Sequence, residues 1–569
     1  SDMAVPYMKK ANPWQQIENN WQALYNDRVY LHGEDAATAG KYASENALSI
    51  SVNEVTNSRG EKWYVTPFEW PGGKDKFIDA TGKLNPNLKM IWNEEDWEWN
   101  KVVFSYKLRQ DYGVDISGQS SNGKTNYFVS AGYLDDKGYS NNDYYKRYSF
   151  RANVETEVTK WLSMGGSLAY SYARANSLGY NRALGFHTSL TSPWLRNMDN
   201  TDWEVSAKTG LRMYDWETMN ANYFGLPAVG RGDYWNNYND ENFNSREYNT
   251  VSAKYFANAK LPFDINFRSS ISIDDNMAAN YGYSSAVHAP DQIPPYGVTV
   301  TTTGGSASRS TNHTISSTWN NILSWDKNLG NHNINLMAGQ EFYNYALTYN
   351  YAYGEGIMSL GQYELASTTE NWEADSNVTK YALLSFFGKA DYNYANKYFL
   401  SASFRRDGSS RFSPESRWGN FWSVGASWRA SNEDFIKNIS WIDNLTIRSS
   451  YGTSGNDRLF SRNSSNGAAG GEIFYAYQSY YTSDNFYGQA GYKPATIATP
   501  ELKWEKNQQF NVAADFALLR NRLTGTVEYY SRGSKDLLYY LELPMSAQVG
   551  NATGYNTNLG NVRNSGIEF

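Results

Sequence analysis

The first candidate for chemistry is a stretch with the spacing of a phosphate-binding loop. Gly118-Gln-Ser-Ser-Asn-Gly123-Lys124-Thr125 matches the pattern Gly-x4-Gly-Lys-Ser/Thr letter for letter. That chemistry needs a helix directly after Thr125, so that backbone amides and the helix N-terminus converge on phosphate. Residues 126–134 instead alternate in polarity like a strand. The pattern therefore predicts a polar hairpin turn and no nucleotide site.

Other catalytic arrangements are weak. The chain has no Cys, which removes thiol nucleophiles, thiolate metal sites and disulfides. The acidic run Glu94-Glu95-Asp96 is typical of a solvated loop, and no Gly-x-Ser-x-Gly elbow occurs. We expect no enzyme, metal or cofactor, because no zinc-type spacing joins the five His residues, His32, His187, His288, His313 and His332.

Ligand binding is better indicated in the segment 175–244, which is rich in Trp and Tyr amid Asn, Asp and Arg. Aromatic faces with polar neighbours can stack on sugar rings or grip peptides. The same rings could instead pack the segment on itself or against a partner. The candidate substrate-binding residues are Trp194, Trp203, Trp216 and Trp235.

From residue 107 onward, the sequence alternates with the period of a β-strand. Tyr127 and Val129 are separated by Phe128, and the following Ser130 and Gly132 belong to a smaller, more polar face. Each run reaches the roughly 9 to 11 residues that a tilted strand needs to cross a bilayer. The fourteen runs lie near 107–117, 124–134, 144–158, 161–174, 245–259, 263–276, 313–327, 332–345, 378–394, 397–407, 418–431, 441–452, 503–517 and 521–538.

Connections between these runs alternate between tight and long, as in a transmembrane barrel with short turns on one side and long loops on the other. Aromatic residues follow the tight links, as an interfacial girdle requires: Trp161, Phe263, Tyr398 and Trp441. Tight links are expected at 159–160, 261–262, 328–331, 395–396 and 520–521, and long ones at 175–244, 277–312, 346–377 and 453–502. We expect the long ones to face the cell exterior.

Residues 1–100 differ from the rest. Trp14, Ile17, Trp21 and Leu24 recur at helical spacing, and a second helical stretch is expected near 35–47. The predicted organisation is a partly helical loop insert over 1–100 and barrel strands with long loops over 101–569.

Composition agrees with a β-protein. The chain is 40% hydrophobic and 16% aromatic, and its mean hydropathy is −0.67, which excludes a bundle of apolar membrane helices. The net charge of −7 is mild and its signs are interspersed, so nucleic acid is not an expected partner. Residues 1–569 contain no secretory signal pattern.

Several ordered blocks resemble the SusC/RagA-like TonB-dependent outer-membrane proteins of Bacteroidetes. The resemblance extends over nearly everything from residue 100 onward. The blocks are the hairpin 125–138, Lys146-Arg-Tyr148, Lys160-Trp-Leu162, the run 398–412, Arg417-Trp-Gly419, 423–428, 451–456, 502–505, 535–537 and 561–569.

This resemblance implies an integral outer-membrane barrel of 22 strands, about fourteen of them represented here. It also implies a lumenal plug, a TonB-contacting segment and a SusD-like surface lipoprotein as lid. Relative to that pattern the chain lacks the plug and the last strands, so it is expected to be a fragment. Membrane lipid and lipopolysaccharide would surround it.

The implied function is nutrient import, with an oligosaccharide as the expected substrate and a peptide as the alternative. A barrel-forming adhesin or secretion protein would share the alternation but should lack the ordered blocks. A surface hydrolase would need a carboxylate pair or nucleophile that spacing does not reveal.

Overall fold

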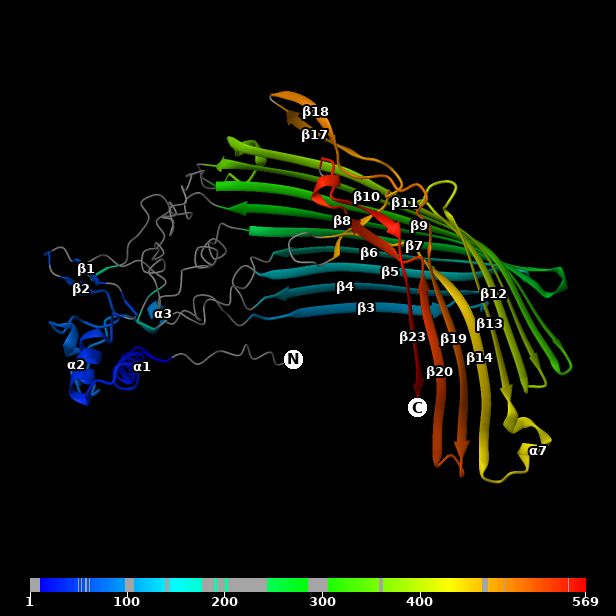
Figure 1. Ribbon diagram of the computed structural model, residues 1–569, viewed down its shortest axis with the longest axis horizontal. Helices are drawn as coiled ribbons and strands as arrows, with labels where there is room; N and C mark the ends of the chain where they lie inside the picture. The colour runs from blue at the N-terminus through cyan, green and yellow to red at the C-terminus, as the bar shows by residue number, and fades with distance from the viewer. Residues whose placement is uncertain are drawn as a thin grey trace.

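The computed structural model shows a large curved β-sheet with a small helical unit beyond one of its ends (Figure 1). Within the described part of the chain, no helix is long and apolar enough to cross a membrane. The structure describes residues 11–49, 51–52, 54–56, 59–60, 62–97, 107–138, 143–176, 189–190, 192, 200–202, 243–284, 305–357, 362–462, 469–486, 488–550 and 552–569.

Among the described residues, fifteen strands form one antiparallel sheet in which strands that follow one another along the chain are neighbours. This mostly β architecture confirms the predicted fold class. The strands are β3 (Gln110–Gln119), β4 (Thr125–Lys137), β5 (Tyr144–Thr159), β6 (Leu162–Asn176), β7 (Phe243–Leu261), β8 (Ile265–Ser284), β9 (Gly305–Leu329), β10 (His332–Ile357), β11 (Glu370–Tyr394), β12 (Tyr398–Ser409), β13 (Trp418–Arg429), β14 (Ile442–Asn456), β19 (Glu505–Leu518), β20 (Leu523–Lys535) and β23 (Asn561–Glu568).

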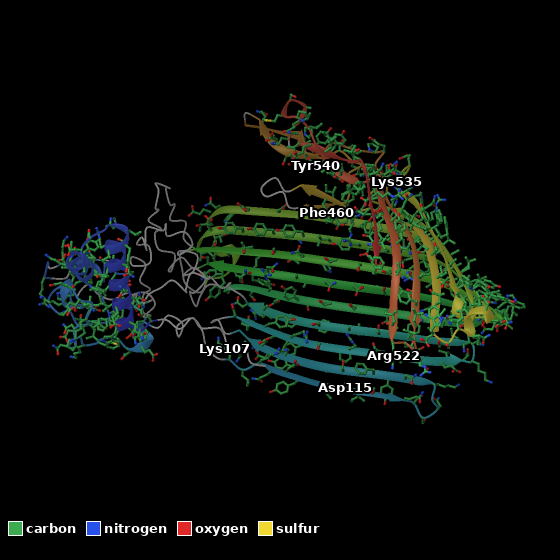
Figure 2. All side chains as sticks on the ribbon, turned by 60° about the horizontal axis from the view of Figure 1, so that its bottom comes forward. Lys107, Asp115, Phe460, Arg522, Lys535 and Tyr540 are labelled. Atoms are coloured by element: carbon green, nitrogen blue, oxygen red, sulfur yellow. The ribbon has the colours of Figure 1, made fainter. Side chains whose placement is uncertain are left out.

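The two ends of the sheet differ in their connections. At one end, here called the short-turn end, the strands are joined by residues 120–124, 160–161, 262–264, 330–331, 395–397, 430–441 and 519–522. Ala395 and Asn396 adopt positive φ angles of 52° and 55°, which lets β11 reverse into β12 within three residues. The other end, here called the long-connection end, carries the longer segments, and Lys107 and Arg522 mark the opposite ends in Figure 2.

Several strands run further than the apolar alternation predicts. β9 and β10 contain 25 and 26 residues and remain paired from His332–Leu329 to Ile357–Gly305. The expected long connections 277–312 and 346–377 are therefore wrong at their edges, because backbone pairing continues where side chains become polar. Beyond the last of the fourteen predicted runs, β23 begins at Asn561 and pairs with β20.

The alternation separates two faces of the sheet. Val129, Leu168 and Val424 lie on one face and are 37%, 38% and 41% exposed. The opposite face carries Ser, Asn, Asp and Arg at the intervening positions, and Ser401 and Arg448 of this face help to line a hollow. An exposed apolar face opposite a polar concave one is the pattern of a membrane barrel wall.

The helical unit has its own buried core. It contains α1 (Pro13–Asn26), a π-helix (Asp27–Leu31), α2 (Ala36–Asn46), β1 (Glu54–Thr56), β2 (Lys62–Tyr64), a 3-10 turn (Lys74–Lys76) and α3 (Glu94–Trp97). Asn12 and Gln15 form a capping box at α1. Hydrogen bonds from Thr38 lower the pKa of Asp35, which caps α2. Ile17, Phe68, Phe77, Ile78 and Leu190 are fully buried in this core.

The unit is tied to the long connection between β6 and β7. Asn200 accepts a hydrogen bond from Trp92 Nε1 at 3.0 Å and donates to the Thr66 carbonyl at 2.8 Å. Leu190, from the same connection, is buried in the core of the unit. Residues far apart in sequence therefore form one body beyond the long-connection end.

Other buried clusters lie where connections cover the long-connection end. Phe412, Leu502 and Trp504 pack with Phe421 of β13, and Trp504 donates to the Arg417 carbonyl at 2.7 Å. Three hairpins stand near this end: β15 (Leu459–Arg462) with β16 (Ala469–Ile473), β17 (Tyr481–Phe486) with β18 (Gln489–Pro494), and β21 (Leu538–Glu542) with β22 (Gly554–Asn558). The single-layer sheet packs against a core mainly at this end.

Candidate functional site on the concave face

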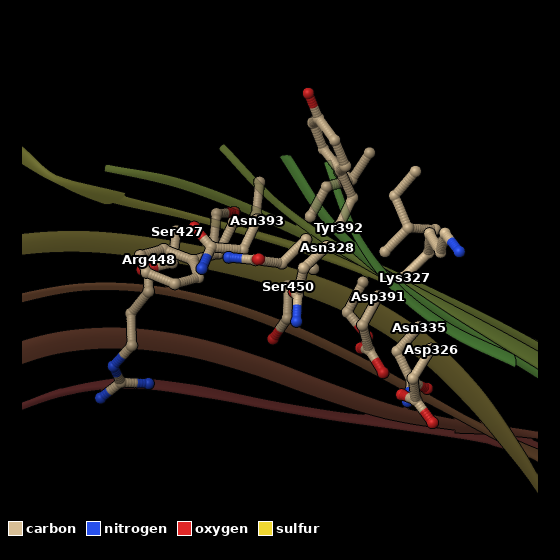
Figure 3. Close-up of a pocket in the computed structure, with 18 of the residues that line it drawn as sticks. Asp326, Lys327, Asn328, Asn335, Asp391, Tyr392, Asn393, Ser427, Arg448 and Ser450 are labelled. Carbon is tan, nitrogen blue, oxygen red and sulfur yellow. The ribbon is translucent and has the colours of Figure 1, made fainter. Parts of the chain in front are cut away.

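A hollow of about 490 Å³ lies on the polar face of the sheet, toward the short-turn end. Seven strands contribute to it, from β9 to β14 and β19. Figure 3 shows Asp326, Asn335 and Asp391 pointing to the same side of the ribbon, while Tyr392 points to the other. Small residues such as Gly425 leave the space open. The wall can therefore accept a polar solute or a packed polypeptide segment.

Arg448 of β14 is the main cation of this hollow. Its Nε lies 3.0 Å from Asp515 Oδ2, and its Nη2 lies 2.7 Å from Glu528 Oε2. The strand register brings Arg448 close to Glu528, because Arg448 is paired with Ala513 of β19, and Ala513 is paired with Glu528 of β20. Two carboxylates around one guanidinium give this group a net negative charge, and both contacts are charge-assisted hydrogen bonds.

A second charged group lies on the same face, nearer the long-connection end. Arg405 of β12 pairs with Asp407 at 2.6 Å and with Glu341 of β10 at 3.1 Å, and it also donates to Ser385 at 2.8 Å. Its guanidinium lies 5.3 Å from the centre of the Phe387 ring. These contacts join three adjacent strands across the concave face and use three of the five N–H donors of the guanidinium.

A third Arg holds a connection at the long-connection end. The Arg411 side chain is only 5% exposed and pairs with Glu472 at 2.8 Å and Asp457 at 3.6 Å. Its guanidinium lies between the rings of Tyr381 and Phe474, 4.7 and 4.2 Å from their centres. Desolvated cation–π contacts of this kind add to the ion pairs. The cluster fixes the β15–β16 hairpin against β11.

The sequence candidates have different outcomes. Trp194, Trp203, Trp216 and Trp235 all lie outside the described residues, so their role stays a prediction. The predicted turn at 118–125 is confirmed, because β3 ends at Gln119, Ser120 N donates to Thr125 O at 2.8 Å, and β4 begins at Thr125. The residues that match the phosphate-binding loop pattern therefore form a hairpin turn between β3 and β4.

Two of the His residues and the acidic run also have described contacts, whereas His187 and His288 lie outside the described residues. His313 lies 2.8 Å from Asp275, and His332 lies 2.7 Å from the Tyr392 hydroxyl. Asp96 accepts a hydrogen bond from the Asn93 amide at the start of α3. No group of three or more metal-ligating side chains occurs among the residues that the structure describes.

Sequence reasoning missed the charged residues of the concave face. The alternation in the sequence places Asp515 and Glu528 on the polar face of their strands, but it indicates no function for them. The available signal is a charged residue within an otherwise apolar strand, at a position where the alternation places a side chain on the polar face. Asp515, which Phe-Ala-Leu follows, is such a residue. That signal identifies a lumenal position but not the partner, which lies 67 or 80 residues away.

Comparison with known proteins gives consistent matches. The family model for the TonB dependent receptor-like β-barrel matches residues 199–569. The chain is 25% identical to TonB-dependent receptor P39 of Formosa agariphila, over 94% of this chain and 49% of that protein. It is 24% identical to TonB-dependent receptor SusC of Bacteroides thetaiotaomicron, over 94% of this chain and 51% of that protein.

Among solved structures, the fold is similar to the RagAB peptide importer in its closed-closed state. The TM-score is 0.63 at 21% identity, over 98% of this chain and 55% of that chain. A second RagAB peptide transporter structure gives a TM-score of 0.62 at 23% identity, over 83% of this chain and 49% of that chain. The chain spans about half the length of the curated relatives it matches.

Proposed function

This chain belongs to the TonB-dependent receptor β-barrel family, and we propose that the complete protein imports a nutrient across the outer membrane. The family is one of non-enzymatic transporters, and the chain is part of an integral outer-membrane barrel. The match over residues 199–569 carries the proposal. The polar concave face around Arg448 supports it, because a hydrated wall suits the passage of a polar solute.

The long-connection end faces the cell exterior in this proposal. Long loops lie outside and short turns lie on the periplasmic side in bacterial outer-membrane barrels. The helical unit of residues 11–97 would then lie on the cell surface. Protease treatment of intact cells tests this orientation, because cleavage in the β14–β19 connection is expected without opening the cells. Cleavage restricted to periplasmic protease would contradict it.

The partners proposed for the complete protein are a SusD-like surface lipoprotein and the TonB complex, with lipid and lipopolysaccharide around the barrel. The similarity to SusC of Bacteroides thetaiotaomicron supports this choice. Purification of the complete protein from its own cells should recover a lipoprotein lid. A polypeptide restricted to residues 1–569 is not expected to accumulate substrate, because energised import requires a plug that TonB can pull.

The proposed substrate is an oligosaccharide. Trp194, Trp203, Trp216 and Trp235 lie in a segment rich in Asn, Asp and Arg, and this mixture suits flat sugar faces bearing hydroxyls. A peptide is the alternative outcome, because the same rings could form apolar pockets along a peptide backbone. The RagAB complex is a peptide importer, and the likeness of this chain to it concerns the fold.

The test combines uptake with identification of the bound material. Uptake of the co-purified compound should require a functional TonB complex. Changing the four Trp residues to Ala should weaken glycan binding, whereas the control Trp422→Ala, on the outer apolar face, should leave it unchanged. Bound peptides without glycan, or unchanged glycan affinity in all four variants, would overturn the substrate assignment. Uptake that persists without TonB would overturn the transport mechanism.

A further inference from the structure

The connection between β13 and β14 is built differently from the other short turns. Residues 430–441 contain a 3-10 turn (Ala430–Asn432) and the short helix α7 (Asp434–Lys437) before β14 starts. Figure 1 shows α7 past the end of β13 and beside the start of β14. A two-residue turn would suffice to reverse an antiparallel pair. Reversal of the chain therefore does not account for the extra residues.

Glu433 holds this connection against the outer, apolar face of the sheet. Its carboxylate accepts hydrogen bonds from Lys397 Nζ at 2.8 Å, the Tyr398 hydroxyl at 2.6 Å and Trp428 Nε1 at 3.2 Å. Tyr398 and Trp428 are register partners on adjacent strands. They lie on the same face as Leu400 and Val424, which are 49% and 41% exposed. The connection thus folds onto the side that faces lipid.

Next to this anchor, the connection exposes an aromatic ring. Phe435 is 69% exposed and follows Glu433 by two residues, in a turn closed by the bond from Lys437 N to Glu433 O at 2.8 Å. Trp441, at the end of the connection, is 51% exposed, and Tyr398 beside Glu433 is 46% exposed. Trp and Tyr concentrate at membrane–water boundaries, and Phe is common on the apolar side of segments that lie in the interface. This exposed group is continuous with the apolar face of an outer-membrane barrel.

We propose that residues 430–441 form a membrane-surface anchor, in which the Phe435 ring inserts among phospholipid headgroups at the short-turn end. Glu433 orients the segment through Lys397, Tyr398 and Trp428, so the ring meets lipid without disturbing strand pairing. Short apolar insertions of this kind lie at the headgroup–acyl boundary. The partner is the phospholipid surface itself, and the proposal does not depend on the transported substrate.

Site-directed spin labelling in phospholipid nanodiscs tests the anchor. Residues 1–569 contain no Cys, so one introduced Cys in this region of the complete protein gives one new label position. A label at Phe435→Cys should collide more with apolar oxygen than with a water-soluble nickel reagent. The matched control is Asn122→Cys in the exposed polar turn between β3 and β4, at the same end, where the ranking should reverse.

A second substitution tests whether Glu433 orients the Phe435 ring toward lipid, or whether position 435 is lipid-exposed only because it lies near the membrane. Glu433→Gln removes the charge that its three donors hold, so the label at 435 should lose its lipid exposure while the label at 122 stays unchanged. Two results would overturn the proposal. One is preferential nickel access at 435 in the otherwise unchanged protein. The other is a label at 435 that neither reagent reaches, which would indicate a protein partner or a second copy.

Discussion

Arg411 provides a direct measure of how firmly a connection at the long-connection end is held. We consider Arg411→Met, which keeps much of the side-chain volume and removes the charge. The change deprives Glu472 and Asp457 of their ion pair and the Ile473 carbonyl of a donor at 3.0 Å. The β15–β16 hairpin should then open more often, while the sheet keeps its pairing.

The magnitude follows from burial. Removing one partner of a buried ion pair costs about 3–5 kcal/mol. Glu472 is 32% exposed, so water compensates part of the loss and we take the lower value, about 3 kcal/mol. The lost cation–π contacts with Tyr381 and Phe474 are roughly replaced by methionine–aromatic contacts. About 3 kcal/mol corresponds to a factor of roughly 150 in the opening equilibrium.

Hydrogen–deuterium exchange of the complete protein in nanodiscs measures this opening. Amides of β15 and β16 should exchange roughly 150-fold faster in Arg411→Met, because exchange through fast local opening follows its free energy. The control Arg448→Met removes a cation from the opposite end of β14 and should leave the hairpin unchanged. Unchanged hairpin exchange in Arg411→Met, or equal acceleration throughout the sheet, would refute the reasoning.

Three further predictions concern other elements. Donors from Lys397, Tyr398 and Trp428 lower the pKa of Glu433 from about 4.5 to about 2, so its stabilising contribution is complete above pH 4.5 and is lost as the pH falls through 2. A spin label in residues 430–441 should gain mobility over that range, and Glu433→Gln should abolish the step. Asn200→Ala removes the two buried hydrogen bonds to Trp92 Nε1 and the Thr66 carbonyl, so it should destabilise the helical unit by about 2 kcal/mol and speed limited proteolysis there. Phe412→Ala should lower stability by about 3–5 kcal/mol, seen as faster exchange in the β12–β13 connection; a loss below about 1 kcal/mol would contradict the assigned core.

The sequence by itself determined the class of the sheet and the face of each strand. The side-chain period of two decides locally which residues share a face, so Tyr127, Val129 and their counterparts could be assigned without partners. Tight links at 395–396 and 520–521 were also predictable, because few residues can reverse a chain. The ordered blocks that resemble the SusC/RagA-like family also predicted that the protein lies in the outer membrane.

The tertiary structure decided which charged residues meet and how far the strands extend. Arg448 meets Asp515 and Glu528 only through the register of three strands, and an ion pair across 67 or 80 residues leaves no local pattern. Strands β9 and β10 continue past the apolar region because backbone hydrogen bonds need no apolar side chains. The outward placement of Glu433 likewise depends on Lys397, Tyr398 and Trp428, which the turn between β11 and β12 and the end of β13 bring together in space.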